Sequence, residues 1–436
     1  MSFASLGLSP FIVKALAAKG YTAPTAVQAR AIPAVLAGAD LLVSSQTGSG
    51  KTAVFVLPSL ERLVATPGVS GKGPRVLVLA PTRELALQVK NAADDYGREF
   101  RGLRTAAIVG GAAYGEQLRS LARPVDIVVA TPGRLLDHLQ RGRIDLARVE
   151  TLVLDEADRM LDMGFIEDIE AIVARTPATR QTLLFSATLE GVVGRLAQRV
   201  TRNARRIEVT PAPSDAGRIN QRLLFADGHG HKTRLLDALL REPTLGQALV
   251  FTATKRAAED LSAELRAQGF SAAALHGDMP QGSRNRTLRA LRQGHTRVLV
   301  ATDVAARGID VPGISHVINF DLPKQAEDYV HRIGRTGRAG RDGIAVSLAH
   351  HGERHLVRAI ERFTAQSISV GVIPGLEPTS RSRGDAAVPR RTHAPNRTDT
   401  RKAPLGYGAP SRGWSSGPAK GQQQERGARA AGKGWR

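Results

Sequence analysis

Short apolar runs rich in β-branched residues recur along the first 210 residues, and each is followed by a stretch with helical spacing of its apolar positions. The runs lie at 41–43, 76–79, 127–129, 152–154 and 183–185. Near-continuous apolar runs of this length are typical of parallel strands buried on both faces, and their alternation with helices indicates βαβ units. The pattern therefore predicts an α/β domain with a parallel sheet.

A second series of the same kind follows a break at 210–217, where proline, glycine and small polar residues replace the apolar pattern. Its runs lie at 248–251, 272–275, 298–300, 317–320 and 344–348. We therefore expect two consecutive α/β domains, residues 1–208 and 219–371, joined by a linker at 209–218.

The last part of the chain has a different composition. Between Leu376 and the C-terminus, Leu376, Val388 and Leu405 are the only Leu, Ile, Val, Phe or Met residues, and 372–436 holds 13 basic against 4 acidic residues. Such a segment buries too little apolar surface to offset the entropy of ordering. The sequence predicts that 372–436 is a disordered basic tail.

Composition narrows the function classes. The 436 residues carry a net charge of +21, which favours a polyanionic partner such as nucleic acid. The absence of cysteine excludes disulfides, thiol catalysis and cysteine-ligated metal sites. No apolar run approaches the about 18 residues of a membrane span, and the first residues lack the layout of a signal peptide, so a cytoplasmic protein without membrane contact is expected.

A glycine-rich segment, SQTGSGKT at 45–52, follows the first apolar run and precedes a helical pattern. Glycines let backbone amides turn toward phosphate oxygens, and the helix N-terminus adds its dipole. We expect Lys51 to reach the β- and γ-phosphates and the Thr52 hydroxyl to ligate Mg²⁺. Ser45 stands where the strict pattern has glycine, and Pro58 is expected to kink the following helix or end it early.

Acidic residues follow the buried run at 151–154, in the segment Asp155-Glu-Ala-Asp158. Parallel α/β sheets bind ligands at the carboxyl ends of their strands. Asp155 is therefore predicted to hold Mg²⁺ through its carboxylate, and Glu156 to orient or deprotonate an attacking water.

In these residues the chain resembles the DEAD-box RNA helicases of superfamily 2, and its brevity and basic tail are most similar to the bacterial RhlE-type branch. The resemblance covers residues 3 to about 371. The motifs that carry it, in chain order, are GY at 20–21 with PTAVQ at 24–28, the loop 45–52, PTRELA at 81–86, GG at 110–111, TPGR at 131–134, DEAD at 155–158, SAT at 186–188, VFT at 250–252, Gln281 to Arg284, ATD at 301–303 through RGID at 307–310, and HRIGRTGR at 331–338.

The resemblance implies two tandem RecA-like domains that bind ATP and Mg²⁺. In the family, Arg335 and Arg338 would act as arginine fingers on the transferring phosphoryl group, and His331 would help to connect that site. Gln28 would read adenine, and the guanine-specific NKxD signature is absent. The remaining residues expected to contact the nucleotide are Phe3, Thr47, Gly48, Ser49, Gly50 and Asp310.

RNA binding is implied by the same resemblance. Backbone amides and hydroxyls at loop ends suit phosphates and 2′-hydroxyls, so recognition is expected to follow the RNA backbone and not its base sequence. Ser186 and Thr188 resemble the hydroxyl pair that couples the ATP and RNA sites. The expected RNA contacts are Arg83, Gly111, Thr131, Gly133, Arg134, Arg284, Thr302 and Gly308.

The sequence leaves alternative functions open. A DNA translocase of the wider superfamily would be stimulated equally by DNA, and an ATP-gated RNA clamp or annealing chaperone would bind without needing turnover. The basic, aromatic-containing tail is expected to tether RNA, or else only to keep the chain in solution. Ribosome assembly, RNA decay and cold adaptation fit the sequence equally well.

Overall fold

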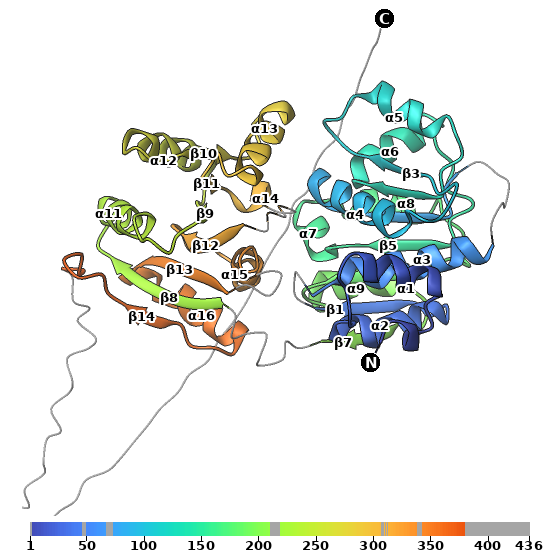
Figure 1. Cartoon of the computed structure of the whole chain (residues 1–436), viewed down its shortest axis with the longest axis horizontal. Helices are drawn as coiled ribbons and strands as arrows, with labels where there is room; N and C mark the ends of the chain where they lie inside the picture. Colours follow the sequence, from blue (N-terminus) through green and yellow to red (C-terminus); the bar gives the residue numbers. More distant parts are fainter. Residues whose placement is uncertain are drawn as a thin grey trace, which may run out of the picture. The chain divides into compact units, whose positions relative to one another are not determined.

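The structure, a computed structural model, describes residues 2–45, 49–66, 73–209, 219–306, 309, 311, 313–337 and 342–379. These residues form two parallel seven-stranded sheets, each covered by helices (Figure 1). Among the described helices, none is long and apolar enough to cross a membrane.

The first domain contains the sheet with strand order β3-β4-β2-β5-β6-β1-β7. Its strands are β1 (Leu41–Ser44), β2 (Val76–Leu79), β3 (Thr105–Ile108), β4 (Ile127–Ala130), β5 (Thr151–Leu154), β6 (Gln181–Ser186) and β7 (Arg205–Glu208). Its helices are α1 (Pro10–Ala18), α2 (Ala26–Leu36), α3 (Lys51–Ala65), α4 (Arg83–Tyr96), α5 (Tyr114–Leu121), α6 (Pro132–Gln140), α7 (Ala157–Asp162), α8 (Ile166–Val173) and α9 (Gly191–Val200).

The second domain repeats this order with β10-β11-β9-β12-β13-β8-β14. Its strands are β8 (Ile219–Ala226), β9 (Gln247–Phe251), β10 (Ala272–Leu275), β11 (Val298–Ala301), β12 (Ile314–Asn319), β13 (Gly343–His350) and β14 (Ser369–Gly371). Its helices are α11 (His229–Leu240), α12 (Lys255–Ala267), α13 (Gln281–Arg292), α14 (Asp303–Ala306), α15 (Ala326–Ile333) and α16 (Arg354–Thr364).

Alternating side chains of one strand pack on opposite faces of its sheet. On β2, Val76 and Val78 join the core beneath α1 to α4, whereas Leu77 and Leu79 join the core beneath α6 to α9. All four are buried, which explains why the strand is apolar along its whole length. The apolar runs predicted as strands are confirmed, and the α/β class with tandem parallel sheets is confirmed with them.

The expectation that Pro58 would end its helix early is wrong. Helix α3 continues through Pro58 to Ala65. Proline cannot donate the helical hydrogen bond, but Phe55, Leu60 and Leu63 around it are buried in the core, and this apolar burial holds the helix together.

Two predicted segments lie partly or wholly beyond these residues. Most of the expected linker, 210–218, and the tail from 380 onward are outside the described residues. The first part of the expected tail, 372–379, contacts the second domain: Ile373 and Leu376 pack against its core, and the Thr379 amide donates to Asp227 at 2.7 Å.

Candidate nucleotide and RNA site

The phosphate loop leaves the carboxyl end of β1 and enters α3. Lys51 is the first residue of α3, and its Nζ donates to the Ser45 carbonyl at 2.7 Å, so this cation is held across the loop. The Ser45 and Ser49 hydroxyls lie 3.1 Å apart. Thr52 follows Lys51 in the first helical turn, whereas Thr47 and Gly48 are outside the described residues.

Gly50 shows why this position needs glycine. Its φ of +89° lies in the left-handed region, and a Cβ there would come within 2.4 Å of Gln28 Nε2. Gln28 donates to the Gly50 carbonyl at 3.2 Å, and its Oε1 accepts from the Thr25 amide at 2.9 Å. The Thr25 hydroxyl donates to the Ser49 carbonyl at 2.8 Å. Thr25 and Gln28 therefore cap α2 and brace the phosphate loop at once.

Phe3, the other residue expected near the base, lies in the core of the first domain and is 5% exposed. A core position is the alternative that a lone aromatic suggests for Phe3, but the capping role of Gln28 was missed, although the Thr-Ala-Val-Gln segment has the spacing of a capping box.

The acidic pair lies at the carboxyl end of β5. Asp155 is 3% exposed, and Glu156 is buried beside it in the left-handed conformation, with φ 51° and ψ 54°. A non-glycine residue held there stores backbone strain, which is common where a side chain must be aimed. Burial, and next the charge of Glu156, raise the pKa of Asp155 to about 7, while the charge of Lys51 opposes that rise.

Asp158 connects three motifs, a role that the sequence reasoning missed although the residue lies in the DEAD segment itself. Its Oδ2 accepts from the Ala187 amide at 2.9 Å and lies 4.0 Å from His331 Nε2. Ser186 is fully buried, and its hydroxyl accepts from the Thr188 amide at 3.3 Å. The structure thus brings Asp158, the Ser186–Thr188 segment and His331 together.

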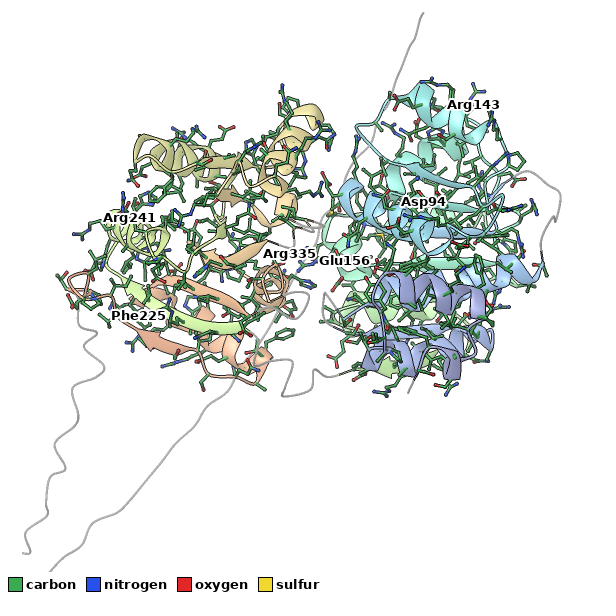
Figure 2. The ribbon with its side chains drawn as sticks, in the orientation of Figure 1. Asp94, Arg143, Glu156, Phe225, Arg241 and Arg335 are labelled. Atoms are coloured by element: carbon green, nitrogen blue, oxygen red, sulfur yellow. The ribbon has the colours of Figure 1, made fainter. Side chains whose placement is uncertain are left out.

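The arginine segment is anchored to the second domain by hydrogen bonds. Arg335 is buried and donates to the carbonyls of His331 and Ile309 at 3.2 and 2.9 Å. Arg332 makes a bidentate pair with Asp303 at 2.6 and 2.7 Å. Figure 2 labels Arg335 and Glu156. Arg338 and Asp310 are outside the described residues.

The residues expected to bind RNA on the first domain gather beside α4 and α6. Arg83 begins α4, and its Nε and one terminal nitrogen are buried with no hydrogen-bond partner among the described residues. A Cβ on Gly111 would lie 3.5 Å from that terminal nitrogen. Thr131 precedes α6 and accepts from the Gly110 amide at 3.4 Å, and Arg134 donates to the Ala112 carbonyl at 3.3 Å.

Gly133 lies in the first turn of α6, two residues after Thr131, and a Cβ there would come within 3.3 Å of Asp168 Oδ2. On the second domain, Thr302 is buried at the end of β11, and Gly308 is outside the described residues. Arg284 donates to Glu84 of the first domain at 3.0 Å. Arg159 likewise pairs with Asp328. The motif patterns gave no signal for these two ion pairs between the domains.

Comparisons with known proteins agree with this geometry. Residues 25–196 match the DEAD/DEAH box helicase family, and 231–340 match the helicase conserved C-terminal domain. The ATP-dependent RNA helicase SrmB of Escherichia coli is 44% identical over 87% of this chain and 86% of that protein. The ATP-dependent RNA helicase DeaD of Mycobacterium tuberculosis is 45% identical over 88% of this chain and 67% of that protein.

Solved structures give the same result. Yeast Dbp5 bound to RNA and ADP BeF3 matches with a TM-score of 0.76 and 32% identity over 85% of this chain and 95% of that one. Mss116p bound to ssRNA and AMP-PNP matches with a TM-score of 0.77 and 27% identity over 85% and 79%. Because both family models match, over 25–196 and 231–340, and two RNA helicases are 44–45% identical over most of the chain, the chain belongs to the DEAD-box family and is an ATP-dependent RNA helicase.

Proposed function

We propose that this helicase hydrolyses ATP at the carboxyl edge of the first sheet, with Lys51 holding the phosphates and Glu156 orienting the attacking water. The observation that supports this most strongly is the sheet itself: β1 and β5 both pair in parallel with β6, so the loop after β1 and the acidic pair after β5 lie at the same carboxyl edge. Glu156 is also buried at this edge, and its backbone is held in the left-handed conformation.

The residues present suit Mg²⁺. A hydroxyl from Thr52 and a carboxylate from Asp155 are the oxygen ligands this ion prefers, and the raised pKa of the buried Asp155 indicates a carboxylate that lacks enough nearby positive charge. Mg²⁺ bound between these residues and the phosphates would neutralise charge on the transferring group. Thr47, Gly48, Ser49 and Gly50 complete the proposed phosphate loop.

The adenine and ribose contacts belong to the same proposal. To read adenine, the Gln28 amide would exchange its Thr25 and Gly50 partners for the base, with Phe3 nearby and Asp310 at the ribose. Arg335 and Arg338 would stabilise the charge that develops on the phosphoryl group. Since these residues belong to the second domain, in the segment between α15 and β13, hydrolysis would depend on the two domains closing.

RNA would bind along its backbone, across both domains. Two buried guanidinium nitrogens of Arg83 have no hydrogen-bond partner in the part of the chain that the structure describes, and this supports the proposal, because a buried donor without an acceptor is costly and a phosphate oxygen would supply the acceptor. Arg284 would exchange Glu84 for RNA. Gly111, Thr131, Gly133, Arg134, Thr302 and Gly308 are the remaining proposed contacts.

Coupling between the two ligands would run through Ser186, Thr188 and His331. If ATP and RNA both bind the closed form more tightly, each must raise the affinity for the other. Closure would bend one RNA strand so that it no longer fits a duplex, which would separate short helices or displace bound proteins. A clamp or annealing role remains the second candidate for the basic tail.

Other parts of the proposal rest on the sequence. We propose the domain limits 1–208 and 219–371, a linker at 209–218, and a basic tail at 372–436 that tethers RNA through the part that follows 372–379, since those first residues contact the second domain. The brevity of the chain and this tail favour the RhlE-type branch, while the relatives reported above carry the names DeaD and SrmB. The helicase is proposed to act in the cytoplasm, on RNA of ribosomal or RNA-decay assemblies.

The test is steady-state ATP hydrolysis without nucleic acid, with single-stranded RNA and with DNA of matched sequence, for the natural chain and Glu156→Gln. We expect RNA alone to stimulate turnover, and Glu156→Gln to lower kcat by about 10²–10⁴-fold while ATP binding persists. Equal stimulation by DNA would indicate a general translocase, and full activity of the variant would contradict the role of Glu156.

A further inference from the structure

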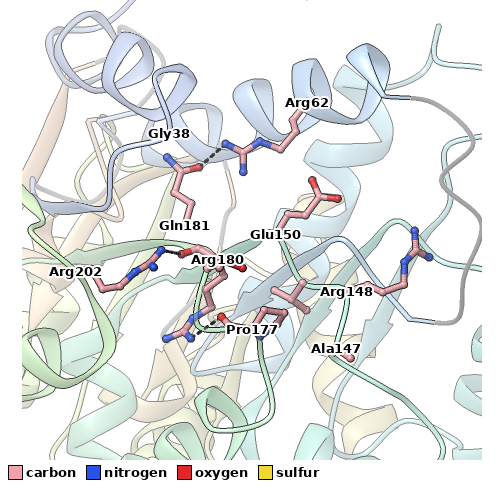
Figure 3. Close-up of a pocket in the computed structure, with 11 residues that line it drawn as sticks. Gly38, Arg62, Ala147, Arg148, Glu150, Pro177, Arg180, Gln181 and Arg202 are labelled. Carbon is pink, nitrogen blue, oxygen red and sulfur yellow. Dashed lines mark hydrogen bonds between the residues drawn. The ribbon is translucent and has the colours of Figure 1, made fainter.

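The amino edge of the first sheet carries a cavity of about 570 Å³, at the opposite ends of the strands from the phosphate loop (Figure 3). It is lined by the segments that lead into β1, β5 and β6, together with α3 and the connection between α9 and β7. A four-residue strand spans roughly 13 Å, so the cavity is separate from the nucleotide site at the carboxyl edge.

Four arginines line this cavity: Arg62, Arg148, Arg180 and Arg202. Glu150 is the one lining carboxylate, and it is already bound by Arg75, whose Nε donates to it at 2.6 Å. The lining therefore has an excess of positive charge.

The arginines that hydrogen-bond within the described residues do so to neutral oxygens. Arg62 donates to Thr151 Oγ1 at 2.7 Å and to Gln181 Oε1 at 3.0 Å. Arg180 donates to the carbonyls of Pro177 and Val200 at 3.0 and 3.1 Å, and Arg202 donates to the Arg180 carbonyl at 2.8 Å. Figure 3 shows several of these bonds around the cavity.

Arg180 gives the strongest support for an anion at this site. Its side chain is only 9% exposed, and its Nε is buried with no hydrogen-bond partner among the described residues. Burial lowers its pKa, and although the charge of Asp40 opposes this, that carboxylate accepts hydrogen bonds from the amides of Thr182 and Arg202. Burial also lowers the pKa of Arg62, although the charge of Glu150 opposes this shift. Each shift reflects a buried cation that an added anion would stabilise.

We propose that this arginine cavity binds a compact phosphate anion, either free or at the end of an RNA chain. Guanidinium groups converging from several segments suit the several oxygens of a phosphate. The cavity has the size of a small-molecule site, and no aromatic side chain lines it on which a base could stack. The ligand is therefore recognised by its phosphates and not by a nucleobase.

The experiment titrates the full-length chain with pyrophosphate in EDTA at about 0.15 M ionic strength, where surface charges are screened. Calorimetry is done on the Lys51→Ala background, which removes the phosphate-loop cation. We expect one saturable site per chain. Arg148→Gln combined with Arg202→Gln, and separately Arg180→Gln, should each weaken binding about tenfold or more. Arg143→Gln, an exposed arginine of the same domain, is the charge-matched control and should leave binding unchanged.

Competition with RNA identifies the source of the anion. If 5′-phosphorylated RNA displaces pyrophosphate and 5′-hydroxyl RNA does not, the phosphate belongs to an RNA end; if neither displaces it, the anion is free. The proposal is overturned if Lys51→Ala binds no pyrophosphate, or if the cavity variants and Arg143→Gln bind equally. Should Arg180→Gln fail to fold, the double variant decides, because Arg148 and Arg202 are less buried.

Discussion

The two domains have the same sheet topology but differ in the loop that follows the first strand of each sheet. Counted from the start of each domain, both sheets have the strand order 3-4-2-5-6-1-7. After the first strand of the first domain, six residues, 45–50, lead into α3. After the first strand of the second domain, only two, 227–228, lead into α11. Two residues are too few to wrap around a phosphate group, which supports our proposal that the loop of the first domain holds the phosphates of the nucleotide.

Two lysines show the same contrast. Among the described residues, the Lys51 Nζ donates one hydrogen bond, which crosses the phosphate loop to the Ser45 carbonyl. Lys232, in the first turns of α11, is 2% exposed, and its Nζ lies 2.8 Å from the Phe320 carbonyl, 3.4 Å from Asp321 and 3.9 Å from Glu353. Lys232 is therefore held at the edge of the second sheet by the Phe320 carbonyl and two carboxylates. Lys51 has no such carboxylate pair among the described residues, so we propose that its charge is available to a phosphate.

The largest expected effect comes from the arginine that the second domain contributes. Arg335→Ala should lower RNA-stimulated kcat by about 10³-fold or more while RNA binding persists, because the phosphoryl charge loses its stabilising cation. ATPase assays with RNA titrations check this. Arg241→Ala is the matched control, since that exposed arginine is paired with Asp237 on its own helix and should leave kcat unchanged. A normal kcat for Arg335→Ala would exclude Arg335 from catalysis.

A smaller effect is expected at the residue that connects the domains' motifs. Asp158→Asn keeps one of two acceptor oxygens, so either the Ala187 or the Arg159 amide loses its partner. We expect RNA stimulation of ATP hydrolysis to fall about tenfold, with basal hydrolysis less affected. Asp162→Asn on the same helix is the control. If both variants behave alike, Asp158 has no special coupling role.

The smallest effect concerns equivalent helix caps. Thr82 accepts from the Leu85 amide at 3.2 Å, and Thr254, at the same place in the second domain, accepts from the Ala257 amide at 3.1 Å. Thr82→Ala and Thr254→Ala should each lower the free energy of unfolding by about 1 kcal/mol, and the serine variants should restore it. Urea denaturation measures this. A large difference in the free energy of unfolding between the two alanine variants would show that the two helix caps do not contribute equally to stability.

The sequence predicts the central strands because they are buried on both faces and therefore apolar throughout, as in β2 and β9. It does not reveal β7, where three of four residues are charged and only Ile207 is buried, or the short edge strand β3. Edge strands bury one face, so their pattern is weaker.

The parts of the site that lie within sequence motifs could be predicted from the sequence. Glycine, lysine and carboxylate positions identify the phosphate loop and the acidic pair. The Glu84–Arg284 pair and the ion pairs of Lys232 join residues far apart in the chain, so no local pattern identifies them. The excess of arginine in the cavity was likewise spread over several segments, from Arg62 to Arg202.

The most direct test of the contrast between the domains is the number of nucleotides bound per chain. A non-hydrolysable ATP analogue is titrated into the natural chain, Lys51→Ala and Lys232→Met by calorimetry. We predict one site per chain in the natural protein and in Lys232→Met, and affinity at least about tenfold lower in Lys51→Ala. Two sites per chain, or binding that survives in Lys51→Ala and is lost in Lys232→Met, would contradict the account.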